Sequence, residues 1–184
     1  MSIEGVKNSM GQVKKVNDAA KIRVSGLSIG IHEFHFVYDS SVLGFDGNFP
    51  KQVEIDAILD KTAHQILLKV NLRTSGRFQC DRCLDEFEQP ILTSYQIFYL
   101  YHGTETARIV QDELQIIGPD TVEINLTEDI RQTILLSVPL KLLCSEDCKG
   151  LCPRCGANWN LRLCNCKEDV GDPRLQGLKD LLNN

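Results

Sequence analysis

The feature that most constrains this chain is the placement of its eight cysteines, which form four close pairs. Three pairs follow one another in the run Cys144-SED-Cys148-KGL-Cys152-PR-Cys155-GANWNLRL-Cys164-N-Cys166, and the fourth, Cys80-DR-Cys83, lies upstream. Pairs of thiolates at such short gaps are the ligands of tetrahedral zinc sites, with Zn–S distances of about 2.3 Å. Eight thiolates complete two such sites. The sequence therefore predicts two structural zinc ions.

The compartment favours metal over disulfide bonds. The N-terminal residues, MSIEGVKNSMGQVKKVNDAA, lack the apolar core of a signal peptide. No segment approaches the run of about 18 apolar residues that a membrane span needs. A cytoplasmic location is the prediction, with no membrane contact. Because cytoplasmic thiols are kept reduced, metal ligation is preferred, and the disulfide interpretation stays open as the lesser alternative.

The charge argues against a protein that coats nucleic acid through a basic surface. The formal net charge is −5, and each four-thiolate zinc site would add about −2. Local basic clusters remain, formed by Arg73, Arg77, Arg82, Lys141, Lys149, Arg154 and Arg162. The preferred interpretation is that they solvate the surface or offset thiolate charge, and the alternative is that they contact RNA.

The sequence does not fix which cysteines share an ion. The favoured grouping joins Cys152 and Cys155 with Cys164 and Cys166, and joins the Cys80 pair with the Cys144 pair. The eight-residue gap between Cys155 and Cys164 allows one tight excursion. Gly156, directly after Cys155, suits a turn with positive φ. In the alternative, the Cys144 pair would share its ion with the Cys152 pair.

Sites with four protein ligands leave no position for water, which points away from catalysis. The deaminase pattern is absent, since no histidine has a glutamate two places on. The run His32-Glu-Phe-His35 is one residue short of a metalloprotease motif and lies in a strand-like region. Little helix can follow Cys83 before Pro90, unlike a thioredoxin-type site. A redox-responsive thiol protein stays open as a hypothesis.

The first part of the chain predicts a β-rich domain. Apolar residues alternate with polar ones over residues 66–72, and the same parity continues to Cys80, so the first cysteine pair should follow a long strand. Gly76 could bend that strand. Residues 53–57 predict the preceding strand and residues 91–101 the following one. Residues 51–101 thus predict an antiparallel meander.

A turn at Gly118-Pro-Asp, a short strand over 122–124 and a helix follow. Thr127 is the expected N-cap, and Glu128 and Asp129 suit the positive end of the helix dipole. The apolar face would consist of Ile130, Ile134, Leu135 and Val138. The fold class is therefore α+β, with an antiparallel sheet, a packed helix and a C-terminal module of the zinc-ribbon or zinc-knuckle type.

Three regions are expected: a mobile tail over 1–20, the β-rich domain over 21–140, and the cysteine-rich module over 141–184. The module should end in a short helix capped by Asp172, with Leu175, Leu178 and Leu182 on one side. It could dock within the chain or on a partner. Trp159 should shield the core of the small module, and the alternative is stacking on an RNA base.

The cysteine-rich segment and its flanks resemble the YceD family, the large ribosomal RNA subunit accumulation proteins of bacteria and chloroplasts. The resemblance is carried by Val138-Pro-Leu, the run from Leu143-Cys144 to Cys155-Gly-Ala-Asn, Cys164-Asn-Cys166 and Asp172-Pro-Arg-Leu175. Cys80-Asp-Arg-Cys83-Leu84 after a long strand resembles the first cysteine pair of the same family.

This resemblance implies a non-enzymatic role in the synthesis, processing or stability of large-subunit ribosomal RNA. Its expected partners are that RNA precursor or large-subunit ribosomal proteins, with no small-molecule substrate. The eight cysteines carry over as zinc ligands, and no catalytic residue does. Two rival hypotheses stay open: a zinc-stabilised adaptor between proteins, and the redox-responsive thiol protein.

Overall fold

The computed structural model describes residues 20–45, 47–101 and 114–166. These residues form two compact units. The first contains residues 20–78 and 87–140, and the second contains 79–86 together with the residues that follow Leu140. The short segment between two long strands thus belongs with the cysteine-rich region.

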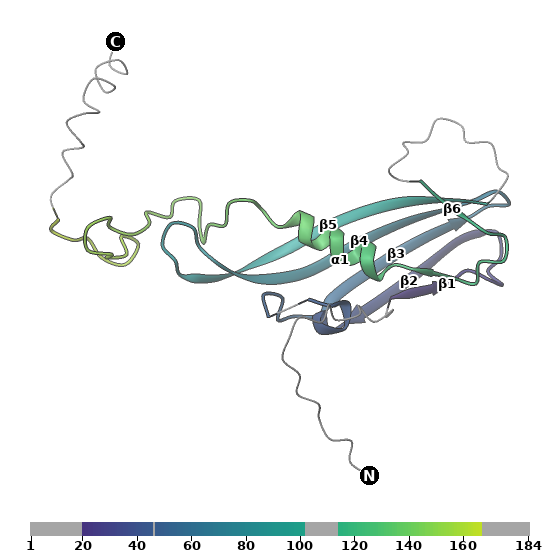
Figure 1. Ribbon diagram of the computed structural model, residues 1–184, viewed down its shortest axis with the longest axis horizontal. Helices are drawn as coiled ribbons and strands as arrows, with labels where there is room; N and C mark the ends of the chain where they lie inside the picture. The colour runs from purple at the N-terminus through teal and green to yellow at the C-terminus, as the bar shows by residue number, and fades with distance from the viewer. Residues whose placement is uncertain (1–19, 46, 102–113, 167–184) are drawn as a thin grey trace, which may run out of the picture. The chain divides into compact units, whose positions relative to one another are not determined.

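A five-stranded sheet dominates the first unit, with the strand order β2-β3-β4-β5-β6 (Figure 1). Its strands are β2 (Gly30–Tyr38), β3 (Val53–Lys61), β4 (Gln65–Gln79), β5 (Glu86–Tyr101) and β6 (Leu114–Ile117). β2 pairs antiparallel with β3, and β3 pairs antiparallel with β4. Within the meander predicted over residues 51–101, the antiparallel pairing of β3 with β4 is confirmed, and β5 lies next to β4 in the sheet. β4 is the long strand expected before the first cysteine pair.

The predicted antiparallel sheet is mixed at one edge. β6 pairs parallel with β5, with Phe98 opposite Leu114 and Leu100 opposite Ile116. A parallel pair needs a long connection between its strands, and residues 102–113 join β5 to β6. The sequence prediction included no strand in the region of β6.

A second, two-stranded sheet joins chain segments that lie far apart in sequence. β1 (Lys21–Arg23) pairs antiparallel with β7 (Glu123–Asn125), with Ile22 opposite Ile124. The predicted turn precedes β7, where the Thr121 N–H donates to the Gly118 carbonyl at 3.1 Å. Ala20, which the predicted tail includes, is fully buried. Residues 1–19 lie outside the described residues, as does the predicted C-terminal helix.

The helix α1 (Thr127–Ser137) confirms the predicted helix but not its cap. The N-cap residue is Leu126, which makes no side-chain capping bond. The Thr127 hydroxyl instead accepts the Ala20 N–H at 3.1 Å, and Asn125 Oδ1 accepts the Thr127 N–H at 3.0 Å. The β1–β7 pairing brings Ala20 to the Thr127 hydroxyl, so this hydroxyl makes a tertiary hydrogen bond, and Asn125 supplies the local side-chain bond to the first helical N–H.

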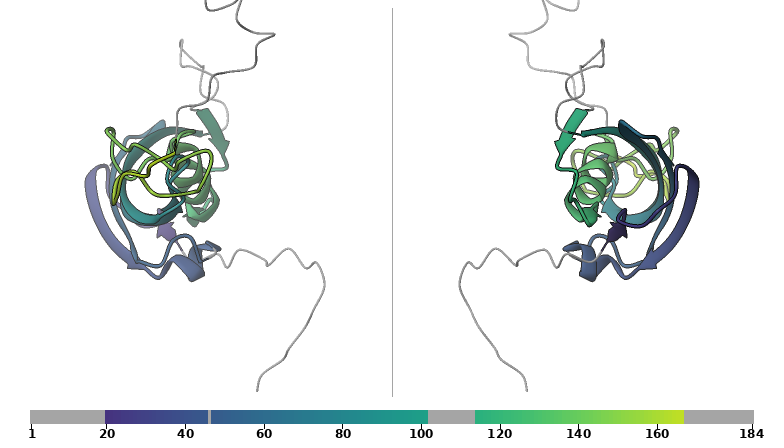
Figure 2. Two further views of the ribbon diagram at one scale, coloured as in Figure 1. Left: turned by 90° about the vertical axis from the view of Figure 1, so that its left-hand side faces the viewer. Right: turned by 90° about the vertical axis from the view of Figure 1, so that its right-hand side faces the viewer.

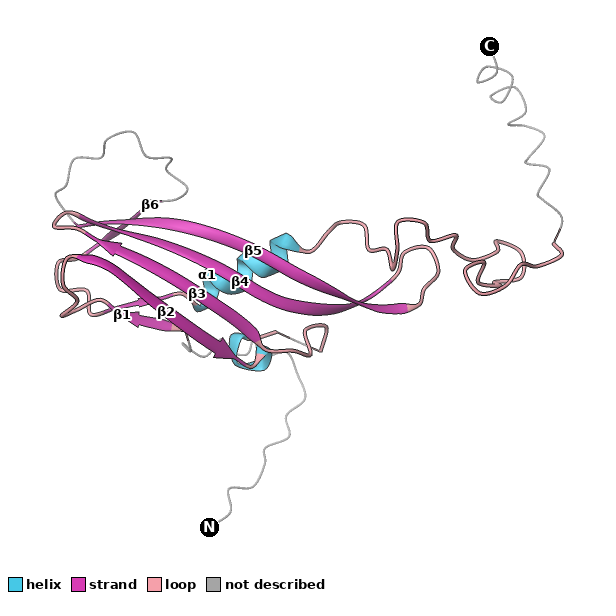
Figure 3. Ribbon diagram, turned by 180° about the vertical axis from the view of Figure 1, so that it is seen from behind, coloured by secondary structure: helices cyan, strands magenta, loops and turns pink. Residues whose placement is uncertain are grey.

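Two-residue periodicity places the core on one face of the sheet. β3 buries Val53, Ile55, Ala57 and Leu59, and β4 buries Ile66, Leu68, Val70 and Leu72. Figures 2 and 3 show the curved sheet and α1 lying along it. Ile130 and Ile134 of α1 are fully buried in the same cluster, whereas Leu135 is 42% exposed. The predicted helix face is therefore correct except at Leu135.

Gly76 provides space inside β4 and does not interrupt it. The strand continues through this residue to Gln79. A Cβ atom at Gly76 would overlap the Phe78 ring, so this ring covers the position of the missing side chain.

Among the described residues, no helix has the length and apolar character that crossing a bilayer requires.

Candidate metal centres

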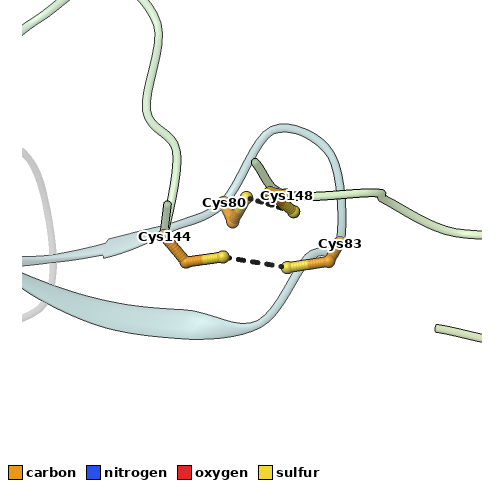
Figure 4. A group of neighbouring side chains, drawn as sticks. All are labelled: Cys80, Cys83, Cys144 and Cys148. Carbon is orange, nitrogen blue, oxygen red and sulfur yellow. Dashed lines mark hydrogen bonds between the residues drawn. The ribbon is translucent and has the colours of Figure 1, made fainter. Parts of the chain in front are cut away.

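The first candidate centre joins cysteines that are far apart in sequence. Cys80 and Cys83 leave the end of β4, and Cys144 and Cys148 follow α1. The four sulfurs converge from these two segments (Figure 4), with 3.8 Å between Cys80 Sγ and Cys148 Sγ and 3.6 Å between Cys83 Sγ and Cys144 Sγ. Cys144 is exposed and the other three are buried. We call these four residues the long-range cluster.

The second candidate centre is made by one short stretch of chain. Its ligands are Cys152, Cys155, Cys164 and Cys166, which we call the local cluster. In each cluster all four Sγ atoms lie within 4.8 Å of one another. The structure thus brings the eight cysteines together in the favoured grouping, and the alternative, in which Cys144 and Cys148 join Cys152 and Cys155, does not occur.

The geometry of the long-range cluster fits a tetrahedral metal ion. Four Zn–S bonds of 2.3 Å place neighbouring sulfurs about 3.8 Å apart, close to the two distances found. A disulfide needs an S–S distance of about 2.05 Å, and none of the eight cysteines forms a disulfide bond. A set of four thiolates suits zinc, a borderline-soft cation, and leaves no coordination position for water.

Both clusters are built on the same backbone turn. In the first, the Leu84 N–H donates to the Cys80 carbonyl at 2.9 Å; in the second, the Gly156 N–H donates to the Cys152 carbonyl at 2.9 Å. The residue after the second cysteine is left-handed in both, with φ of 60° at Leu84 and 70° at Gly156. The sequence indicated this turn at Gly156, but Leu84 gives no such signal because leucine rarely adopts positive φ.

Polar contacts hold the two segments of the long-range cluster together. The Asp81 N–H donates to the Leu142 carbonyl, and Asp81 Oδ2 accepts the Leu142 N–H, both at 2.8 Å. Arg82 Nη1 donates to the carbonyls of Cys148, at 2.7 Å, and Glu146, at 3.2 Å. Arg82 therefore links the first cysteine pair to the segment that carries Cys148. This contact agrees with a structural role for Arg82.

Another basic candidate is also engaged within the protein. Arg73 in β4 donates to Glu54 at 3.1 Å and to Asp56 at 2.8 Å. Asp56 also contacts His35 Nδ1 at 2.6 Å, and the His35 hydrogen bond and the Arg73 charge lower the pKa of Asp56. His32 contacts the Ser28 carbonyl instead, at 2.9 Å. These contacts occupy both histidines of the short His-Glu-Phe-His run.

Each cluster contains one cysteine whose thiolate is favoured before any metal binds. Burial raises the pKa of Cys80, but N–H groups of Cys144, Cys83 and Arg82 outweigh it and lower the pKa to about 6. The Trp159 hydrogen bond is the largest influence that lowers the pKa of Cys164 to about 6. The pKa of Cys166 is raised to about 12, chiefly because its hydrogen bond with Cys155 favours the protonated form of the Cys166 thiol. A bound cation would offset the repulsion between neighbouring thiolates in each cluster.

Trp159, which the sequence analysis singled out, and two asparagines, which it did not, complete the surroundings of the clusters. Trp159, which is half-buried, donates its Nε1–H to Cys164 Sγ at 3.4 Å. Asn160 Nδ2 donates to Cys148 Sγ at 3.3 Å, and Asn158 Nδ2 donates to Asp85 at 2.6 Å. Polar side chains in the gap between two ligand pairs are a signal that could have indicated the two asparagines. The predicted shielding by Trp159 is consistent with its position.

Comparison with known proteins supports one family. A sequence model described as "Large ribosomal RNA subunit accumulation protein YceD" matches residues 68–182. This range covers well over half of the 184 residues and includes all eight cysteines. No solved structure matches the chain.

Several curated proteins are similar. The chain is 28% identical over 131 residues to the uncharacterized protein YlbN of Bacillus subtilis, covering 71% of this chain and 74% of that protein. It is 22% identical over 189 residues to the chloroplastic large ribosomal RNA subunit accumulation protein YCED homolog 1 of Arabidopsis thaliana, covering 89% of this chain and 56% of the plant protein. The corresponding maize protein is 44% identical over 61 residues, which are 32% of this chain and 19% of the maize protein.

The cysteine pattern first indicated this relationship, and the match across both candidate centres now establishes it: the chain belongs to the YceD family of large ribosomal RNA subunit accumulation proteins.

Proposed function

We propose that this protein supports the accumulation of large-subunit ribosomal RNA as a non-enzymatic factor whose cysteine-rich unit is held by two structural zinc ions. Membership of the YceD family carries the proposal. The name of the Arabidopsis relative assigns accumulation of large ribosomal RNA to that protein. The partners would be the large-subunit RNA precursor or ribosomal proteins that assemble on it.

The two four-sulfur clusters support the zinc part of the proposal. In each, four protein ligands would complete the coordination sphere, so the metal would stabilise the fold and not activate water. The second unit offers little other support, since among its described residues only Cys80, Cys83, Cys148 and Cys152 belong to the buried apolar or cysteine side chains. A unit this poor in core residues is of the kind that metal usually holds together.

Depletion of the protein tests the cellular role. We expect the ratio of large-subunit to small-subunit ribosomal RNA to fall in depleted cells and to recover when the wild-type protein is supplied. A Cys83→Ser variant should fail to restore the ratio, because it removes a buried ligand of the long-range cluster. An unchanged ratio after depletion would overturn the proposal.

The matched control is Ser145→Ala, which lies between two ligands but keeps all four sulfurs. Its backbone carbonyl, which accepts the Cys148 N–H at 3.2 Å, is unchanged by the substitution. This variant should restore the ratio as well as the wild type does. Elemental analysis should find two zinc ions in the wild type and in this control.

A second candidate function, a zinc-stabilised adaptor that binds only proteins, is favoured by the net charge of −5. Binding to large-subunit RNA transcripts at 50 and 200 mM salt separates the two candidates. Affinity that falls steeply with salt would support direct RNA contact through phosphates. Absence of RNA binding together with capture of a large-subunit ribosomal protein would support the adaptor.

A further inference from the structure

The two clusters share one loop, residues Asn158, Trp159 and Asn160. This loop lies between the ligand pairs of the local cluster, since it follows Cys155 and precedes Cys164. Its three side chains nevertheless divide between the two clusters. Trp159 contacts a sulfur of the local cluster, whereas both asparagines contact groups of the long-range cluster or its turn.

Asn160 makes the most direct connection. Its Nδ2 donates to Cys148 Sγ at 3.3 Å, and its Oδ1 accepts the Lys149 N–H at 2.8 Å. One side chain therefore fixes both the sulfur and the backbone next to it. An N–H directed at a thiolate offsets part of its negative charge and orients the ligand, as the outer partners of metal ligands do elsewhere.

The rest of the loop holds Asn160 in place. Asn158 Oδ1 accepts the backbone N–H of Asn160 at 3.0 Å and its Nδ2–H at 2.9 Å. Asn158 Nδ2 donates to Asp85 Oδ2 at 2.6 Å, in the segment that carries Cys80 and Cys83. The Trp159 backbone N–H donates to the Gly150 carbonyl at 3.0 Å. Because Gly150 lies between Cys148 and Cys152, this bond fixes the loop to the segment that links the two clusters.

We propose that the two metal sites are filled cooperatively, because closing the local cluster positions Asn160 to stabilise the thiolate of Cys148 in the long-range cluster. The inference rests on the proposed binding of two metal ions. With the local cluster empty, the loop from Cys155 to Cys164 loses its metal-held ends, and the Asn160–Cys148 contact loses its support. Reciprocity then requires that metal in the long-range cluster strengthens binding in the local one.

Metal titration of the apo protein followed by native mass spectrometry tests the proposal. At half-saturation with Zn²⁺, the wild type should consist mainly of molecules with no metal or two, and few with one. Independent sites of equal affinity would instead give half of the molecules one metal ion. Loss of cooperativity in a variant therefore appears as a larger population with one ion.

The sharpest variant is Asn160→Asp. It keeps the oxygen that accepts the Lys149 N–H but replaces the donor to Cys148 Sγ by a charged oxygen. Removing an outer partner of a metal ligand commonly lowers metal affinity about 10-fold to 100-fold, and we expect a loss in this range at the long-range cluster. Asn160→Ala removes the same donor without adding charge and should show a smaller loss of the same kind.

Asn165→Asp is the matched control, because it adds the same charge between two ligands of the local cluster at an exposed position. It should retain the two-ion pattern of the wild type. If Asn160→Asp and Asn160→Ala both behaved like the wild type, the loop would be merely structural and the proposal would be wrong.

A double-mutant cycle completes the test. Cys164→Ser with Cys166→Ser removes the local site, and we expect the remaining site to bind zinc about 10-fold more weakly than in the wild type. Adding Asn160→Asp to this background should change the affinity little, because the loop has already lost its support. Two ions bound independently in the wild type would overturn the coupling alone, whereas fewer than two would overturn the zinc proposal as well.

Discussion

The long-range and local clusters begin with the same backbone turn, but they differ in the burial of their cysteines and in the sequence separation of their ligands. Three of the four cysteines of the long-range cluster are buried, and its sulfurs bring together residues 61 and 68 positions apart. The local cluster closes a single loop, and Cys155 is exposed. One backbone turn can therefore serve two purposes: joining distant segments of a unit, or closing a short loop.

The difference has an energetic consequence. Closing a long loop costs more chain entropy than closing a short one, and metal binding must offset that cost. The contacts of Asp81 and Arg82 with the segment from Leu142 to Cys148 contribute to this closure. The local cluster needs no comparable hydrogen bonds between distant segments, since its ligands are close in sequence. We therefore expect the long-range cluster to decide whether the unit folds.

The largest expected effect separates Cys148→Ser from Cys155→Ser. The first should abolish metal binding at the long-range cluster and raise amide exchange over residues 79–86 and 141–151. The cost should exceed about 3 kcal/mol, because structural zinc contributes about 10–16 kcal/mol in small zinc modules. Cys155→Ser should raise exchange mainly over residues 152–166. Hydrogen exchange on the two metal-loaded variants checks this, and equal, unit-wide loss in both would remove the distinction between the clusters.

Acidification should weaken metal binding at both clusters. Zinc binds thiolates, and the raised pKa values of Cys83, Cys144 and Cys166 keep these thiols protonated near neutral pH in the metal-free protein. Protons therefore compete with zinc, and affinity should fall at least about tenfold for each pH unit between 8 and 6. Below about 6, protonation of Cys80 and Cys164 should steepen the fall.

Competition with a chromophoric chelator at pH 8, 7 and 6 measures this dependence. Both zinc ions should become easier to remove as the pH falls. An affinity that does not change over this range would contradict thiolate ligation. A much steeper fall for one ion would show that the clusters differ in proton uptake as well as in burial.

The smallest effect compares the left-handed residues of the two turns. Gly156→Ala should destabilise its turn by about 1 kcal/mol, since left-handed backbone costs other residues about 1–2 kcal/mol. An added Cβ meets nothing within 4 Å at Gly156, so the cost is conformational. Leu84→Gly should stabilise its turn by up to about 1 kcal/mol, because Leu84 has φ of 60° and is 54% exposed.

Denaturant unfolding in the presence of excess zinc, followed by hydrogen exchange at each turn, checks this pair of substitutions. The two changes should have opposite signs. If Leu84→Gly were destabilising, the Leu84 side chain would contribute more through its contacts than the strain of its backbone costs.

Periodicity was sufficient for most of the sheet. The alternation over residues 66–72 predicted the buried face of β4 because side chains of a strand point alternately to its two sides. The same reasoning could not detect β6, because it has only four residues and their burial does not alternate from one residue to the next. The cap of α1 was also mispredicted, because pairing of β1 with β7 gives the Thr127 hydroxyl a different partner.

The eight candidate ligands could be recognised from sequence because short gaps between cysteines restrict where their sulfurs can lie. Loop length also favoured the correct grouping of Cys152 and Cys155 with Cys164 and Cys166. The contacts of Asn158 and Asn160 could not be derived in this way. These side chains lie in the loop of the local cluster but contact groups of the long-range cluster or its turn. The spacing of residues in the sequence gives no signal for such a contact.

By itself, the sequence determined that the chain has a sheet with one buried face, a following helix and eight cysteines suited to two metal ions, because each of these depends on local spacing. Only the tertiary structure decided how these parts interact. It joined residues 79–86 to the cysteine-rich segment, placed Arg82 against distant carbonyls and directed Asn160 at Cys148. These contacts depend on the path of the folded backbone, which brings together residues whose separation in sequence carries no local signal.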